Sequence, residues 1–108
     1  MIETLLCLLA VHAICDSPLQ PGVLSAAKRK GGVPGFPWPV ALGAHALIHA
    51  GGVALVTGSL WLGAAEFFAH ALIDHAKTRG WLSLVQDQGL HVGCKIVWVI
   101  ILAGGAPL

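Results

Sequence analysis

The sequence predicts an all-α integral membrane protein, a four-helix bundle with a short interfacial helix after the first long helix. Three observations lead to this fold class. Of the 108 residues, 56% are hydrophobic and 10% are charged, whereas a soluble domain averages about 25% charged residues. The apolar residues gather in four long stretches separated by turn signals. The basic residues outside these stretches lie in two of the three connections. The length suits a single domain, residues 1–108.

The expected long helices cover residues 2–16, 40–57, 60–77 and 82–103. Pro18 and Pro21 end the first of them. Residues 22–30 then form the expected interfacial helix, and the stretch GGVPGFPWP, residues 31–39, reads as a loop. Because a bilayer core needs roughly 20 helical residues, we expect the third and fourth helices to span it, the second nearly to do so, and the first to be short.

The basic residues predict the topology. Lys28, Arg29 and Lys30 lie between the first and second helices, and Lys77 and Arg79 lie between the third and fourth. Positive-inside reasoning therefore places both basic loops in the cytoplasm and both chain ends on the far side. We expect a multi-pass protein of the bacterial inner membrane or of a phage-associated membrane. The run KRK serves as a topology signal, or contacts lipid phosphate headgroups.

A repeat places polar residues inside the apolar helices. AHALIH at residues 44–49 returns as AHALID at residues 69–74, and in each copy two side chains that can bind a metal are four residues apart. Residues with this spacing lie on the same face of a helix. All ionisable side chains within the expected helices share it, apart from those at their ends. They are His12 and Asp16; His45 and His49; Glu66, His70 and Asp74; and Asp87, His91 and Lys95.

The depths of these residues also match. The third and fourth helices are expected to run antiparallel around a turn near Gly80. Two residues whose numbers add up to 161 then lie at the same depth in the bundle. This relation places Asp74, His70 and Glu66 level with Asp87, His91 and Lys95, in that order. We expect the pair Glu66 and Lys95 to form a buried ion pair one turn deeper than the other residues.

The energetics of these side chains favour a metal site. One charged residue at the centre of a membrane helix costs about 2.5–3.5 kcal/mol on insertion scales. They must therefore face each other, water or a metal. Histidine and carboxylate ligands projecting inward from facing helices suit one or two divalent ions, either zinc, manganese or iron. The predicted ligands are His12, Asp16, His45, His49, His70, Asp74, Asp87 and His91.

The resulting hypothesis for an enzyme is metal-assisted hydrolysis of a membrane-embedded ester or phosphoester. Asp74 or Asp87, the carboxylates nearest the cytoplasm, would be the catalytic general base. The net charge of +1 argues against a nucleic-acid partner, because such proteins neutralise phosphates with many cations. The expected partners are the lipid bilayer and a second copy of the chain.

Two other classes of function stay open. One is a non-catalytic membrane protein, such as a phage or prophage accessory protein or a virion component, whose polar core only specifies the bundle. The other is a small ion or proton transporter, which would act as a homo-oligomer because four helices rarely enclose a path alone.

The motifs resemble a known family. HAICDSPLQ at residues 12–20 is similar to the H-x3-D-x2-LQ signature that opens the DUF3307 family of small bacterial and phage membrane proteins. The remaining motifs follow in that family's order over nearly the whole chain: KRK at 28–30, HALIH at 45–49, HALID at 70–74 and DQGLH at 87–91. The resemblance implies a membrane protein and no particular reaction. More loosely, the arrangement is similar to YdjM-like inner-membrane proteins, which implies a metal-dependent hydrolase. The loop GGVPGFPWP departs from the usual pattern.

Overall fold

A computed structural model describes residues 1–107 of the chain. Over these residues the protein is all-helical, with five helices and no strand. The all-α prediction is therefore confirmed, including a short helix after the first long one. The helices are α1 (Ile2–Asp16), α2 (Gly22–Lys28), α3 (Trp38–Thr57), α4 (Leu60–Thr78) and α5 (Leu84–Ala103).

Helix α3 begins two residues earlier than predicted. Pro37 is its N-cap and Pro39 lies in its first turn, where a missing N–H leaves no hydrogen bond unmade. Gly58 ends the helix with a left-handed φ of 71°. The longer α3 has 20 residues, and within residues 1–107 it is the one helix both long and apolar enough to cross a membrane. Helices α4 and α5 reach the expected length, with 19 and 20 residues, but do not meet that combined test of length and apolarity, so the four-helix membrane bundle stays a prediction.

Helix α5 begins two residues later than predicted, at Leu84. The Ser83 hydroxyl accepts a hydrogen bond from the Gln86 backbone N–H, and the Gln86 side chain accepts one from the Ser83 backbone N–H. This capping box satisfies two backbone groups and fixes where the helix starts. Helix α2 ends at Lys28, two residues before the predicted limit.

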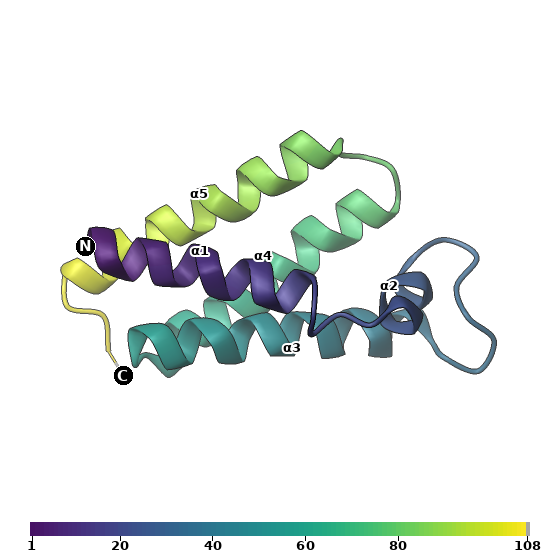
Figure 1. Ribbon diagram of the computed structural model, residues 1–108, viewed down its shortest axis with the longest axis horizontal. Helices are drawn as coiled ribbons and strands as arrows, with labels where there is room; N and C mark the ends of the chain where they lie inside the picture. Colours follow the sequence, from purple (N-terminus) through teal and green to yellow (C-terminus); the bar gives the residue numbers. More distant parts are fainter. Residues whose placement is uncertain (108) are drawn as a thin grey trace.

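The four long helices form an elongated bundle (Figure 1), and the molecule measures 44 × 24 × 21 Å. Helix α3 packs against α1, α2 and α4, and α5 packs against α1 and α4. The N-terminus, Pro107 and the α3–α4 turn lie at one end of the bundle, whereas α2, the loop after it and the α4–α5 turn lie at the other. The two basic connections are therefore at the same end.

Polar residues lie inside this bundle and apolar residues lie outside. Glu66, His70 and Lys95 are each at most 1% exposed, whereas Leu55 is 87% and Val85 is 81% exposed. The buried apolar cluster between the long helices is small, and consists of Leu8, Val53, Leu62, Trp98 and Val99. This distribution is the reverse of that in water-soluble proteins, where charged side chains are almost never fully buried unless they are paired.

Candidate metal centre

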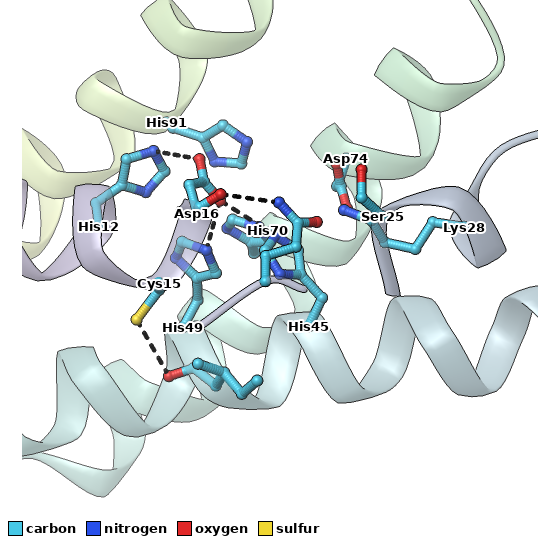
Figure 2. A network of polar contacts seen from close by, with 12 residues as sticks. His12, Cys15, Asp16, Ser25, Lys28, His45, His49, His70, Asp74 and His91 are labelled. Atoms are coloured by element: carbon cyan, nitrogen blue, oxygen red, sulfur yellow. Dashed lines mark hydrogen bonds and ion pairs between the residues drawn. The ribbon is translucent and has the colours of Figure 1, made fainter. Parts of the chain in front are cut away.

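Asp16, the last residue of α1, is the hub of a histidine cluster (Figure 2). Its Oδ1 lies 2.8 Å from His49 Nε2 and 3.2 Å from His45 Nε2. Its Oδ2 lies 3.2 Å from His12 Nε2. The three histidines are at least nine-tenths buried. The two carboxylate oxygens therefore face different histidines, those of α3 on one side and that of α1 on the other.

His70 from α4 and His91 from α5 complete the cluster. The His70 ring stacks on the His49 ring with their centroids 3.7 Å apart. The His91 ring centroid lies 4.3 Å from that of His70 and 5.1 Å from that of His12. Each of the four long helices thus contributes at least one imidazole.

Two sets of ligands in this cluster are close enough to hold a metal ion. Within each set, one donor atom per residue lies within 4.8 Å of the donor atoms of the others. His70 belongs to both sets. The first set is Asp16, His45, His49 and His70, and the second is His12, His70 and His91.

Several ring nitrogens of the cluster have no hydrogen-bond partner within residues 1–107. They include both nitrogens of His70 and the Nδ1 atoms of His12, His45 and His91. A buried polar group left unsatisfied costs about 1–3 kcal/mol. Neutral imidazole nitrogen is also the commonest metal ligand in proteins. The cluster therefore has ligand atoms that the rest of the chain does not use.

The other two predicted ligands, Asp74 and Asp87, lie outside both sets. Asp74 Oδ2 accepts a 2.6 Å hydrogen bond from Lys28 Nζ. Asp87 Oδ2 accepts one of 3.0 Å from Gln88 Nε2, while its Oδ1 lies 3.4 Å from His91 Nε2. Six of the eight residues predicted as ligands thus make up the two sets, and the remaining two carboxylates flank them.

Lys28 differs from its two basic neighbours. It is 4% exposed, because α2 packs against α3 and directs the Lys28 ammonium to Asp74. The Lys28 ammonium is thus paired with a carboxylate, and the role of the KRK run at lipid headgroups stays a prediction. Arg29 and Lys30 are exposed. Helix α2 thereby covers the end of the bundle that is nearer to the histidine cluster.

Glu66 lies one helical turn deeper than His70, in a second polar network that adjoins the histidine cluster. Its Oε1 accepts a 2.5 Å hydrogen bond from Lys95 Nζ, and its Oε2 accepts one of 2.8 Å from Trp98 Nε1. Glu66 Oε1 also lies 3.5 Å from His70 Nδ1. Trp98 was not among the residues predicted for this network. Its spacing of three from Lys95 places both on one helix face, and that was the available signal.

A cavity of about 190 Å³ connects the surface with the histidine cluster. We call it the polar cavity. Exposed Arg29 and buried His70 both line it. Its other ionisable lining residues are Asp16, Lys28, His45, Asp74, Lys77, Asp87 and His91. The cavity opens at the end of the bundle that carries the basic loops, so a small polar molecule has a route to the ligand atoms.

No family model, no curated protein and no solved structure matches the chain. The resemblance to DUF3307 stays a prediction.

Proposed function

We propose that the protein is an integral membrane enzyme that binds one or two divalent metal ions in its His/Asp cluster and hydrolyses an ester or phosphoester of the membrane. One observation carries this proposal. Five histidines and Asp16 from four helices converge inside the bundle, with unused ring nitrogens, beside a cavity that reaches the surface. A bundle that needed only structural hydrogen bonds would satisfy those nitrogens internally.

The distribution of side chains supports membrane placement. The outer faces of the long helices carry large exposed apolar residues, such as Leu47, Leu55, Phe68 and Ile100. So many large apolar side chains exposed on the long helices favour lipid over water as the surrounding medium. The basic residues of both connections lie at one end of the bundle. We therefore propose an inner-membrane, multi-pass protein with that end in the cytoplasm.

The geometry of Asp16 supports two ions rather than one. Its Oδ1 faces His45 and His49, and its Oδ2 faces His12. Asp16 belongs to the first ligand set, and its second oxygen faces a histidine of the second set, so it would lie between two ions held by the two sets. Donors of this kind, without thiolate, suit zinc, manganese or iron. We also propose that the chain belongs to the DUF3307 family. The motifs that resemble this family contain all six residues of the two ligand sets.

The chemistry follows from the residues around the ligands. A bound divalent ion would supply a water of lowered pKa and polarise the scissile group. Asp87 is the better of the two proposed general bases, because its Oδ1 has no hydrogen-bond partner within residues 1–107 and it lines the polar cavity. Asp74 is held by Lys28. Asp74 therefore positions α2 over the cavity in this proposal.

Elemental analysis of the protein purified in mild detergent tests the proposal. We expect at least one equivalent of metal in the wild type and none in a folded His45→Ala/His70→Ala variant. His75→Ala is the matched control, because His75 is on α4 but stacks on Trp38 outside the cluster. Metal-free wild-type protein, or full metal content in the double variant, would overturn the metal site and favour the structural polar core. With metal present, hydrolysis of lipid phosphoesters that is lost in Asp87→Asn would support the enzyme.

A further inference from the structure

A second cavity, of about 390 Å³, lies at the same end of the molecule, between the C-terminal end of α2, the loop after it and the end of α4. We call it the basic cavity. Three cationic side chains line it: Arg29, Lys30 and Arg79. Two aromatic side chains, Phe36 and Trp38, also line it. No aspartate or glutamate is among the lining residues of the described chain.

Within the described residues the three cations have no carboxylate partner. No ion pair within 4.0 Å involves any of them in residues 1–107. The Arg29 guanidinium donates to the neutral Ser25 hydroxyl at 3.2 Å. The Arg79 guanidinium lies over the Trp38 ring, 5.0 Å from its centroid. This cation–π contact orients Arg79 without neutralising it, so the cavity keeps its positive charge.

Tertiary structure brings these cations together from distant parts of the sequence. Arg29 and Lys30 follow α2, whereas Arg79 is the C-cap of α4. Gly31 and Gly32 have φ values of 97° and 56°, a conformation that turns the chain back immediately after the two cations. Gly32 N then donates to Arg29 O at 3.0 Å. The loop thereby forms one wall of the basic cavity.

The polar cavity lacks this charge imbalance. Three carboxylates line it, those of Asp16, Asp74 and Asp87, together with Lys28, Lys77 and Arg29, the last of which also lines the basic cavity. Its charges therefore balance before any metal binds. Anion binding independent of metal is consequently expected at the basic cavity and not at the polar one.

We propose that the basic cavity binds the phosphate of an anionic phospholipid headgroup at the cytoplasmic membrane surface. Guanidinium groups suit phosphate because they offer several donors in a planar fork. Trp38 is 42% exposed at the start of α3, where an indole would lie at the membrane–water interface. The aromatic part of the lining would contact the glycerol and upper acyl groups. This proposal rests on the membrane placement proposed above and is independent of the metal.

The test is lipid binding by the full chain in a nonionic detergent. Short-chain phosphatidylglycerol, short-chain phosphatidylcholine and inorganic phosphate are titrated separately, and binding is followed by calorimetry. We expect saturable binding of phosphatidylglycerol at least tenfold tighter than that of the other two probes. Arg79→Gln and Arg29→Gln/Lys30→Gln should each weaken it about five-fold or more. Lys77→Gln is the matched control, since Lys77 is close in sequence to Arg79 but lines the polar cavity, and it should leave binding unchanged.

Three outcomes would overturn the proposal. Equal affinity for the two lipids would show no headgroup selectivity. An unchanged affinity in the Arg79→Gln and Arg29→Gln/Lys30→Gln variants would place the lipid elsewhere. Phosphate binding as tight as that of phosphatidylglycerol, with the same dependence on Arg79, would assign the cavity to a soluble phosphate. Failure of the membrane proposal is detected separately, because the protein would then leave washed membranes without detergent. Failure of the metal site would change the metal content and not the lipid affinity.

Discussion

The two buried polar regions of the bundle differ in how completely they are satisfied. In the deeper region, Lys95 and Trp98 donate hydrogen bonds to the two oxygens of Glu66. In the region nearer the basic end, neither ring nitrogen of His70 makes a hydrogen bond within the described chain, although its Nδ1 lies 3.5 Å from Glu66 Oε1. A satisfied network needs nothing more from outside, whereas an unsatisfied one gains from a ligand. This difference separates residues that stabilise the fold from residues that are available to a metal.

The largest expected effect comes from breaking the satisfied region. Lys95→Met should lower the free energy of unfolding by about 3–5 kcal/mol, because it leaves the Glu66 carboxylate buried without its cation. Chemical unfolding in detergent, followed by circular dichroism, measures this. The double variant Glu66→Gln/Lys95→Met should recover much of the loss, since Trp98 can still donate to the side-chain amide oxygen that replaces the carboxylate. A double variant no more stable than the single one would contradict this assignment.

Removing metal should affect only the unsatisfied region. With free metal at 100 times its Kd, its removal by a chelator should lower the free energy of unfolding by about 2.7 kcal/mol. A similar decrement is expected in Lys95→Met, provided that the variant is folded, because neither Lys95 nor Glu66 belongs to a ligand set, although Glu66 lies 3.5 Å from His70. In His70→Ala, which alters both ligand sets, the chelator should have no effect. An equal chelator effect in His70→Ala and wild type would show that the metal binds outside this cluster.

A packing variant sharpens the comparison. Gly52 lies where α3 meets α1, and a Cβ added there would be 2.5 Å from Val11 Cγ1. Gly52→Ala should therefore displace α1, with its two cluster residues, and cost about 1–3 kcal/mol. Metal affinity should fall as well, as measured by competition with a chelator. Gly51→Ala is the control, because a Cβ at Gly51 meets no atom within 4 Å. Equal effects of the two variants would contradict the close contact of α1 and α3.

The smallest expected effect concerns the start of α5. Ser83→Ala removes half of the capping box and should lower the free energy of unfolding by about 1 kcal/mol. Asp87 lies in this first turn but belongs to neither ligand set, so metal content should not change. Thermal unfolding and elemental analysis measure the two quantities. A loss of metal in Ser83→Ala would show that the first turn of α5 contributes to the ligand sets after all.

Helix positions and the polar residues that line each helix face were predictable because both depend on local spacing. The intervals of four from His12 to Asp16, from His45 to His49 and from Asp87 to His91 place each pair on one helix face. Prolines and glycines mark the helix ends to within two residues, whereas the cap at Ser83 was recognised only in the structure. The matched depths of the third and fourth predicted helices placed His70 beside His91, and in the structure their ring centroids lie 4.3 Å apart.

Other features of the site depend on how the helices are rotated and how α2 folds back. The hydrophobic period predicts which face of a helix is polar, but it does not predict which donor atoms meet across several helices. Only the tertiary structure shows Asp16 as the hub, Asp74 paired with Lys28, and Trp98 beside Glu66.

The sequence by itself determined an all-helical chain with inward-facing histidines and carboxylates and two basic connections, because each of these follows from spacing along one helix or from composition. The tertiary structure decided which six residues form the two ligand sets, and which three cations line the basic cavity. The physical reason is that these groupings join residues as far apart as Arg29 and Arg79. Their proximity depends on helix packing and loop conformation, which no local pattern encodes.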